Sequence, residues 1–518
     1  MSKLLFLLFL LVNFLPAQII HQLSADRFTQ YTINDWVSYA PALHITSVDI
    51  DENFIYFGSR SGGILRFDKY SEEWKPPFTT SSGLRSNTIF KVVYNQTDGS
   101  LYAQTPEGID VYRPAEKFWR PATDFRMPPS RMPSKLDLSG FSKNNNDRFR
   151  FPPLYRPSNS ELPDFFTRVS IMYHLGGIFY DRHNRQYQFT DRITDSWRRL
   201  WIGSDGYGPL MADLDHTFLK AIPQSIPDIS PRDLYIDGDD IWIGGLRKSD
   251  APAGITHWDQ YEDLWEYFEA FSISELYKDD VFAIDGNEKY IFFATIHGLA
   301  ILDKRKMKWK TVDSRDGLEG DWVYDVLSFQ DKVYIATLYG LNWLNLPSFE
   351  PHESHETTLD NVQVNQLAHD DSSIWAATKF GLYQIDPITD GIIFHGSRAV
   401  LPDYNLTAVE VIGKEIWIAN RSGIAYWDRK SDEWHSFPGL ILGAEIRDIA
   451  KTKNTIWFAT DIGLLKYDRK QDYWRLFTKD DGLIDNDTYH LEVDGKHIWI
   501  STEMGLTSFR WRRKGRID

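Results

Sequence analysis

The sequence contains no cysteine. This absence excludes disulfide bonds, thiolate metal sites, cysteine nucleophiles and the cysteine on which a lipoprotein anchor depends. A chain of 518 residues must then be stabilised by packing alone, and 19 Trp, 26 Tyr and 32 Phe provide material for a large core. With 42% hydrophobic and 25% charged residues, the composition is that of a folded protein rather than a disordered one.

Basic residues are scarce relative to acidic ones. Lys and Arg number 57 against 73 Asp and Glu, which gives a net charge of −16. An acidic chain repels nucleic-acid phosphates unless it presents a basic patch. The one dense basic run lies at the end of the chain, between Arg510 and Arg516, where a solvated tail explains it. We therefore expect no nucleic-acid partner.

A hydrophobic run long enough to span a membrane is also missing. In residues 1–18, the apolar stretch that follows Lys3 ends at Leu15, which is shorter than the roughly 20 residues of a spanning helix. Pro16 and Ala17 then offer a small-residue cleavage site. The pattern predicts a cleaved signal peptide at 1–18, with an uncleaved anchor as the alternative. The mature chain is expected to have no transmembrane segment and to be periplasmic or secreted by a bacterium.

One motif recurs ten times along the chain. It consists of an aliphatic residue, an aromatic residue, an apolar residue, a small residue, Ser or Thr or a stand-in, two free positions and Gly. An aliphatic residue follows, then a large apolar residue and usually Asp or Asn, as in IWIANRSGIAYWD and IWFATDIGLLKYD. The copies begin at residues 55, 101, 200, 241, 291, 333, 374, 416, 456 and 498. The copies at 200 and 241 distort the turn.

Each repeat unit has the pattern of four short strands. Around residue 456, the segments EIRDIA, TIWFAT, LLKYD and YWRLFT are separated by turn residues. The motif Gly suits a tight turn with positive φ, and the closing Asp or Asn starts the next turn through its side chain. Tandem four-stranded units of about 42 residues are typical of a β-propeller, so we predict an all-β propeller of about ten blades.

Ten blades exceed the usual four to eight of a propeller. The sequence therefore predicts either one large ring or two rings, and the seven regular copies from 241 to 498 could form one of the two. The last copy ends where its fourth strand should begin, and the segment around Trp36 resembles an orphan fourth strand. Closure by this N-terminal strand would remove exposed sheet edges.

Tryptophan recurs at two places in the unit, which we interpret as core packing rather than sugar stacking. Six lie at the second place of the motif: Trp201, Trp242, Trp375, Trp417, Trp457 and Trp499. Six more lie eleven or twelve residues beyond the motif Gly: Trp74, Trp119, Trp265, Trp309, Trp434 and Trp474.

The propeller region, 19–518, is interrupted once. Residues 121–165 are rich in Pro, Ser, Asn and Arg and have little periodicity, which predicts a long loop or a disordered insertion. The segment GGIFYD at 176–181 resembles the second half of the motif, so we expect a degraded half-blade after the insertion.

Sequence signatures of catalysis and metal binding are missing. Acidic clusters at 49–53, 237–240 and 369–373 lack the spacing of a calcium loop and fall at expected hairpins, so we interpret them as turns. No His pair has zinc spacing, and no nucleophile elbow or phosphate loop occurs. We predict no cofactor, no metal and no catalytic residue. A carboxylate pair for glycoside cleavage has no linear signature, which leaves a carbohydrate-active enzyme as an alternative.

The repeats resemble the two-component regulator propeller repeat. That family combines a core such as IWIGT-x-x-GL-x-x-YD and a later Trp with a DGL-x-x-N link, and the link occurs here at 82–87, 315–318 and 480–486. The resemblance covers about residues 36–510. It implies a periplasmic sensor propeller of the kind found in hybrid histidine kinases, many of which respond to oligosaccharides. No transmembrane helix and no kinase part follow in this sequence. Similar propellers occur in accessory proteins of the type IX secretion system, whose C-terminal sorting domain we do not find here.

We interpret the chain as an exported ligand-binding or protein-interaction module of the sensor type, with an oligosaccharide or an envelope protein as partner. A carbohydrate-active enzyme and an envelope or secretion assembly scaffold are the alternatives. Loops on a rigid scaffold often carry function, and the two free positions before the motif Gly differ between copies. The predicted binding residues at these positions are Arg60, Glu107, His297, Tyr339, Lys379, Phe380, Arg421, Asp461 and Glu503.

Overall fold

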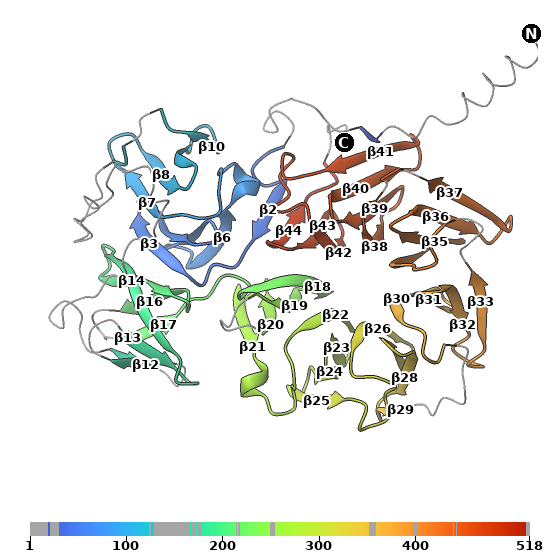
Figure 1. Ribbon diagram of the computed structural model, residues 1–518. Helices are drawn as coiled ribbons and strands as arrows, with labels where there is room; N and C mark the ends of the chain where they lie inside the picture. Colours follow the sequence, from blue (N-terminus) through green and yellow to red (C-terminus); the bar gives the residue numbers. More distant parts are fainter. Residues whose placement is uncertain are drawn as a thin grey trace, which may run out of the picture.

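The computed structural model of the chain is all-β, as the repeats predict (Figure 1). The structure describes residues 19–20, 31–123, 126–128, 165–167, 171–174, 178–213, 215, 218–248, 254–351, 359–396, 401–438, 440–441 and 443–513. Within these residues it has ten sheets, and each copy of the motif supplies two adjacent strands of one sheet. The expected signal peptide at 1–18 and most of the expected insertion at 121–165 lie outside the described residues.

Seven sheets follow one another in the C-terminal part of the chain, and we call them the C-terminal sheets. The first three contain β18 (Ile229–Asp237), β19 (Asp240–Arg247), β20 (Ile255–Asp259), β21 (Leu264–Phe268), β22 (Val281–Gly286), β23 (Tyr290–Thr295), β24 (Gly298–Asp303), β25 (Lys308–Val312), β26 (Val323–Phe329), β27 (Lys332–Thr337), β28 (Leu341–Asn345) and β29 (Glu350–Pro351). The next two contain β30 (Val364–His369), β31 (Ile374–Thr378), β32 (Gly381–Ile385), β33 (Ile392–Gly396), β34 (Ala408–Ile412), β35 (Glu415–Asn420), β36 (Gly423–Asp428) and β37 (Glu433–Pro438). The last two contain β38 (Ile446–Lys451), β39 (Thr455–Thr460), β40 (Gly463–Asp468), β41 (Tyr473–Phe477), β42 (Thr488–Asp494), β43 (His497–Thr502) and β44 (Gly505–Phe509).

The innermost strands of the C-terminal sheets contact one another in a cycle. Strands β18, β22, β26, β30, β34, β38 and β42 each contact the next one, and β42 in turn contacts β18. Figure 1 shows these sheets arranged around a common centre. Within each sheet, consecutive strands pair antiparallel through short turns, which is why a unit of about 42 residues can form a blade locally.

The N-terminal strand expected at Trp36 completes the last sheet. Strand β2 (Trp36–Tyr39) pairs antiparallel with β44, and Trp36 lies opposite Phe509. The two rings are stacked, with centroids 3.8 Å apart. A further short strand, β1 (Ile19–Ile20), pairs parallel with β41. Strand β2 therefore completes the last sheet, whereas β1 extends the sheet before it.

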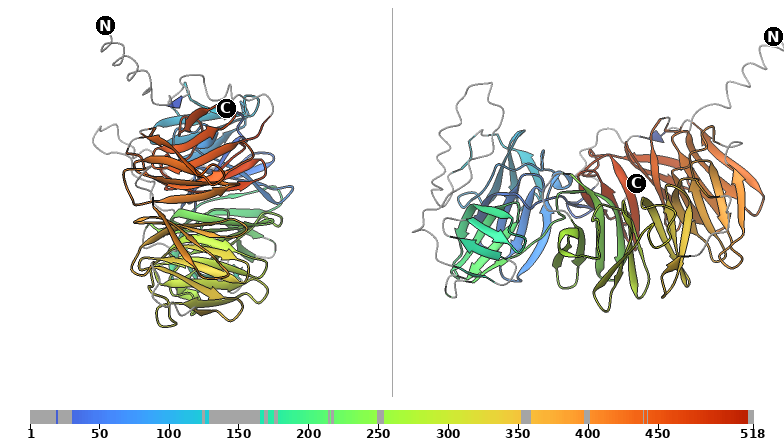
Figure 2. Two further views of the ribbon diagram at one scale, coloured as in Figure 1. Left: turned by 90° about the vertical axis from the view of Figure 1, so that its right-hand side faces the viewer. Right: turned by 60° about the horizontal axis from the view of Figure 1, so that its bottom comes forward.

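The other three sheets, which we call the N-terminal sheets, lie beside the C-terminal sheets (Figure 2). Two contain β3 (Ile45–Ile50), β4 (Phe54–Ser59), β5 (Ile64–Asp68), β6 (Glu73–Phe78), β7 (Lys91–Asn95), β8 (Ser100–Thr105), β9 (Gly108–Arg113) and β10 (Phe118–Pro121). The third contains β11 (Phe166–Thr167), β12 (Ile171–His174), β13 (Ile178–Asp181), β14 (Gln186–Thr194), β15 (Arg199–Asp205), β16 (Pro209–Asp213) and β17 (Phe218–Ala221). Strand β3 contacts both β7 and β14.

The expected half-blade at 176–181 is not a separate unit. Its described part is β13, which pairs with β12 on one side and β14 on the other. These strands extend the sheet of the motif copy at 200 to seven strands. A strand-turn pattern specifies a hairpin but does not specify which sheet the hairpin joins, and here the strands belong to the sheet of the next motif copy.

Tryptophan burial depends on the strand that carries the residue. All six Trp residues at the second motif place are buried, because the second strand is covered on both faces by neighbouring sheets. Three of the six later Trp residues are buried and three are only half-buried. The buried ones are Trp119, Trp265 and Trp474, and the half-buried ones are Trp74, Trp309 and Trp434. The fourth strand lies at the outer edge, so its aromatic residues are shielded to different degrees.

The motif Gly allows the chain to turn tightly between the second and third strands. Gly463 has a φ of 141°, and a Cβ atom there would lie 2.3 Å from the carbonyl oxygen of Phe477. We expect Gly463→Ala to lower the free energy of unfolding by about 2–3 kcal/mol, since strained backbone and a clash with rigid main chain add up. Gly413 has a φ of 67° with nothing within 4 Å of its Cβ position. Gly413→Ala should lower the free energy of unfolding by only about 1 kcal/mol. Equal losses for the two variants in urea denaturation would contradict the role given to Gly463 in the tight turn.

No helix in the part of the chain that the structure describes is both long enough and apolar enough to cross a lipid bilayer. Helical structure there is limited to single turns, such as η2 (Thr80–Ser82) and η4 (Ala270–Ser272), which lie in the links between sheets.

Candidate functional site

The motif Thr holds the turn between the second and third strands in one conformation. Thr295 Oγ1 donates to the carbonyl of Gly298 over 2.8 Å and accepts the backbone N–H of His297 over 3.0 Å. The same two bonds occur at Thr105, Thr337, Thr378 and Thr460. Side chains at the two free positions are therefore presented on a backbone that the Thr and Gly fix.

The turns and the links between sheets open on the same face. The backbone N–H of Lys379 donates to Gln363 O over 3.0 Å, and that of Asp461 donates to Glu445 O over 3.2 Å. Each acceptor belongs to the link that precedes the first strand of the same sheet. Equivalent bonds join Arg60 to His44, Leu338 to Trp322 and Glu503 to Asp487. Residues of the turns and of the links can thus act on one ligand.

The structure places all nine predicted binding residues in these turns. Arg60 and Glu107 belong to the N-terminal sheets, and Arg60 forms an ion pair with Asp205 over 3.1 Å. The other seven belong to the C-terminal sheets: His297, Tyr339, Lys379, Phe380, Arg421, Asp461 and Glu503. The side chains of Tyr339 and Phe380 are each half exposed.

Two of the predicted residues meet at Glu445. Its Oε2 lies 3.3 Å from Arg421 Nη2, and its backbone N–H donates to Asp461 Oδ1 over 3.0 Å. Arg447 approaches the same carboxylate at 3.4 Å and also pairs with Asp487 at 2.5 Å. Ion pairs therefore join the turns and links of three neighbouring sheets, those that begin with β34, β38 and β42.

The innermost strands contribute a second group of residues that the repeat analysis missed. Six of these strands contain a β-bulge. The small fourth residue of the motif has a neighbour on the innermost strand, which lies opposite or beside it. The extra residue of the bulge comes directly before this neighbour. We call these residues, with Thr407 at the equivalent place before β34, the inner belt. They are Arg232, Phe282, Tyr324, Asn365, Thr407, Arg447 and Tyr489, and all are half-buried. Bulges commonly redirect a side chain next to a functional site.

The aromatic part of the belt continues onto the link before β26. Phe282 and Tyr324 have ring centroids 6.0 Å apart, and Trp322 stacks on Tyr324 at 6.1 Å with an interplanar angle of 19°. Trp322 is 45% exposed. Tyr339 lies nearby, because the residue before it donates to the Trp322 carbonyl. We call Phe282, Trp322, Tyr324 and Tyr339 the aromatic patch.

The adjoining part of the belt, on β18, β42 and β38, is charged. The ring of Tyr489 lies between two guanidinium groups, with Arg232 Cζ 3.6 Å and Arg447 Cζ 4.3 Å from its centroid. Its hydroxyl lies 3.0 Å from Asp487 Oδ2 and 2.9 Å from Glu503 Oε2. Burial raises the pKa of Tyr489 to about 12 although Arg232 opposes this shift, so the hydroxyl stays a neutral donor at physiological pH. This side of the face is therefore rigid and hydrogen-bonded.

Five buried aspartates of the innermost strands each bind the neighbouring sheet. Asp448 accepts the backbone N–H of Ile449 over 2.9 Å and that of Leu491, in the next sheet, over 2.8 Å. Burial would disfavour such a carboxylate without these donors. The same two-sided contact is made by Asp49, Asp191, Asp233 and Asp325. We call these five residues the clasp aspartates.

The clasp aspartates correct one part of the interpretation of acidic clusters. Asp51 and Asp370 cap hairpins as expected, by accepting backbone N–H groups two and three residues ahead. Asp49 instead binds the backbone N–H of Tyr94 in the adjacent sheet. In the part of the chain that the structure describes, no three His, Asp or Glu residues come together as a metal-binding group.

A cleft of about 690 Å³ opens where the N-terminal sheets meet the first C-terminal sheet. Its walls include Trp74, Arg199, Lys220 and Tyr261, and the backbone N–H of Trp74 donates to Asp263 Oδ2 across it over 2.8 Å. Burial raises the pKa of Asp263 above its ordinary value. The cleft is a second concave feature, separate from the face that carries the belt.

No family model and no curated protein match the sequence. Among solved structures, the chain is similar to the extracellular domain of the hybrid two-component system BT4673 of B. thetaiotaomicron, with 14% identity, a TM-score of 0.47, and coverage of 91% of this chain and 70% of that one. The corresponding values for the BT3049 domain of the same organism are 15%, 0.46, 90% and 68%. PorZ, a surface component of the type IX secretion system of Porphyromonas gingivalis, has 13% identity and a TM-score of 0.35, with coverage of 92% and 87%.

Proposed function

We propose that the protein is an exported β-propeller that binds a ligand or a partner protein on the face where the turns and links of its C-terminal sheets open. The proposal includes the cleaved signal peptide at 1–18 and closure of the seven C-terminal sheets into one ring, with the N-terminal sheets as a second unit. An oligosaccharide or an envelope protein is the proposed partner, and the module acts in the manner of a sensor domain.

The aromatic patch is the observation that carries this proposal. Large exposed aromatic residues are costly on a surface that contacts only water, and they are enriched among the residues that dominate binding energy. Trp322 offers a half-exposed indole that is already held by stacking on Tyr324, so binding would cost it little conformational entropy. A pre-ordered aromatic surface suits both the apolar face of a sugar ring and a protein side chain.

A comparison within the chain also supports the C-terminal face. In the N-terminal sheets, bulges at the equivalent place carry Thr46 and Thr190, which are small. In the C-terminal sheets, five of the seven belt residues are aromatic or Arg. The same backbone device therefore presents large interacting side chains in one part of the molecule and small ones in the other.

A screen for the ligand tests the proposal directly. We expect thermal unfolding to shift upward with one member of a panel of oligosaccharides and peptidoglycan fragments, since a ligand at 100 times its Kd adds about 2.7 kcal/mol of stability. Capture from a cell-envelope extract followed by identification of the bound protein covers the second type of partner. If neither a panel member nor a specific envelope protein binds, the proposed function is wrong.

Variants locate the binding face once a binder is known. Phe380→Ala, Tyr339→Ala and Trp322→Ala should each change stability by about 0.5 kcal/mol or less, as exposed positions do. At least one should weaken binding by more than about 1 kcal/mol. Phe394 is a matched control for Phe380, since it is similarly exposed on the same sheet but lies in the outer strand β33. Normal binding by all three variants, or an equal loss of binding affinity in Phe394→Ala, would show that the binding site lies elsewhere.

A carbohydrate-active enzyme is the second candidate, and the cleft favours it. Asp263 is a carboxyl with a raised pKa in a concave site, which is a property of a general acid in glycoside cleavage. Release of reducing sugar from a glycan panel, abolished by Asp263→Asn, would support this candidate. Unchanged release of reducing sugar by Asp263→Asn would show that other residues carry the hydrolytic activity.

A further inference from the structure

One histidine joins the last C-terminal sheet to the two sheets beside it in the cycle. His490 on β42 has Nε2 at 2.9 Å from Asp233 Oδ1 on β18, and Nδ1 at 3.0 Å from Asp448 Oδ2 on β38. Both aspartates are clasp aspartates, and both side chains are over nine-tenths buried. His490 occupies the position in its own strand that Asp448 and Asp233 occupy in theirs, directly before Leu491.

Each ring nitrogen of His490 lies within 3.0 Å of a carboxylate oxygen, an arrangement that favours the doubly protonated ring. An ionised carboxylate only accepts hydrogen bonds, and a neutral imidazole would turn a lone pair toward one of the two carboxylates. Each aspartate also accepts two backbone N–H groups, which favours its ionised form. Burial alone would lower the pKa of His490, but Asp233 and Asp448 outweigh burial and hold it well above 6.5.

Other ionisable groups near His490 are also acidic. Glu492, on the same strand, approaches Nε2 at 3.9 Å, and burial raises its pKa to about 7. Asp285 on β22 lies close enough to act on Glu492, and burial raises its own pKa to about 7. Gln366 on β30 donates to the other oxygen of Asp448 over 2.7 Å. No cation other than His490 pairs with Asp233 or Asp448 among the described residues, so this ring supplies the compensating charge.

The residues that precede the three charged groups belong to the inner belt. Arg232 precedes Asp233, Arg447 precedes Asp448, and Tyr489 precedes His490. The Arg232–Tyr489–Arg447 stack therefore lies one residue along the chain from the Asp233–His490–Asp448 contacts, on the same three strands. A change in the spacing of β18, β38 and β42 must therefore alter both the stacked rings and the histidine–aspartate contacts.

We propose that doubly protonated His490 locks β18 and β38 to β42, and that loss of one proton opens this junction and separates the Arg232–Tyr489–Arg447 stack. The neutral ring would face two buried carboxylates with only one hydrogen, leaving the two negative charges without a compensating cation. Uncompensated charges are strongly destabilising in a protein interior. The device makes the junction of the first and last C-terminal sheets sensitive to alkaline pH.

The direction of the pH effect follows from the raised pKa. A histidine whose folded pKa exceeds its unfolded value contributes its full stability below about 6.5 and loses it as the pH rises through the folded pKa. Glu492 and Asp285 titrate lower, between their ordinary range and about 7. Asp325, on which the charge of Asp233 acts, also has a pKa raised well above its ordinary value by burial, so the His490→Gln variant is needed to assign an alkaline opening step to His490.

Hydrogen exchange measured by mass spectrometry on the full chain from pH 6 to 10 tests the lock. After correction for the intrinsic exchange rate, we expect protection of peptides from β18 and β42 to fall at least tenfold across one alkaline step, while β30 and β34 keep theirs. Asp233→Asn should move the step to lower pH, because it removes one of the two charges that stabilise the imidazolium. His490→Gln should give low protection of β18 and β42 at every pH, with no step.

A matched control is His435→Gln, since His435 is exposed and stacks on Tyr426. This variant should retain the step unchanged. Flat protection of β18 and β42 in the unaltered protein would overturn the proposal, as would a step that His490→Gln or Asp233→Asn leaves at the same pH. Because exchange needs no ligand, this test can fail while ligand binding at the aromatic patch succeeds, and the reverse holds as well.

Discussion

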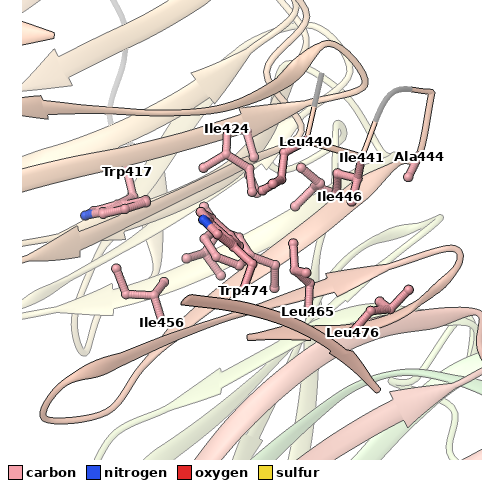
Figure 3. Close-up of a cluster of buried hydrophobic side chains, with 14 residues drawn as sticks. Trp417, Ile424, Leu440, Ile441, Ala444, Ile446, Ile456, Leu465, Trp474 and Leu476 are labelled. Carbon is pink, nitrogen blue, oxygen red and sulfur yellow. The ribbon is translucent and has the colours of Figure 1, made fainter. Parts of the chain in front are cut away.

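We expect Trp474→Ala to lower the free energy of unfolding by about 3–5 kcal/mol, as truncation of a large buried aromatic residue does. Trp474 is buried in the cluster between the sheets of β34–β37 and β38–β41, where it lies close to Ile456 and Leu465 (Figure 3). Its ring stacks on Tyr467 with centroids 4.3 Å apart and meets Phe437 edge-on at 5.1 Å. Urea denaturation of the variant measures the loss.

Trp434→Ala is the matched comparison. Trp434 occupies the same place in the preceding repeat unit and stacks on Trp427, but it is only half-buried. Less apolar surface returns to water when it is removed, so we expect about half the loss seen for Trp474→Ala or less. Equal losses for the two variants would show that burial in the fourth strand does not set the contribution of these residues.

Removal of residues up to 40 should unfold or expose the last C-terminal sheet. The truncation deletes β2, leaves the edge of β44 unpaired and removes Trp36, whose ring covers Phe509 and approaches Phe477 at 5.9 Å. We expect a loss of at least about 3–5 kcal/mol, the value for a single buried Trp. Hydrogen exchange in Gly505–Phe509 should rise to the rate of an unprotected strand.

Truncation through residue 30 is the control, because it leaves β2 in place. The exchange of β44 should then match that of the full chain. Trp36→Ala separates the two contributions of β2: it should reduce stability while β44 keeps its backbone pairing with Val37 and Ser38. Normal exchange of β44 after truncation through 40 would show that another segment protects this edge.

The candidate site was predicted only in part. The turns that carry Tyr339 and Phe380 could be located from the repeat, because the motif Thr and Gly mark their positions. The inner belt could not, since a bulge interrupts the alternation of a strand by one residue and leaves no fixed residue type behind. A weak signal existed in Tyr324-Asp325 and Arg447-Asp448, where a large side chain precedes an Asp inside a strand.

The repeat unit was determined by the sequence alone, because its strands, turns and capping residues interact over short distances along the chain. Asp468, for example, accepts the backbone N–H groups of Lys470 and Gln471, as its place after the third strand predicts. Such contacts depend on residues within one unit of about 40 residues, and therefore repeat whenever the motif repeats.

Only the tertiary structure decided how the units meet. Asp448 reads in the sequence as an ordinary polar residue of a half-buried strand, yet it is buried and binds Leu491 in the next sheet. His490 finds Asp233 only because the last C-terminal sheet contacts the first. These pairings depend on the order in which sheets pack around a centre. A pattern that is local to each unit contains no information about that order, and for this reason the belt, the clasp aspartates and the lock became visible only in the folded protein.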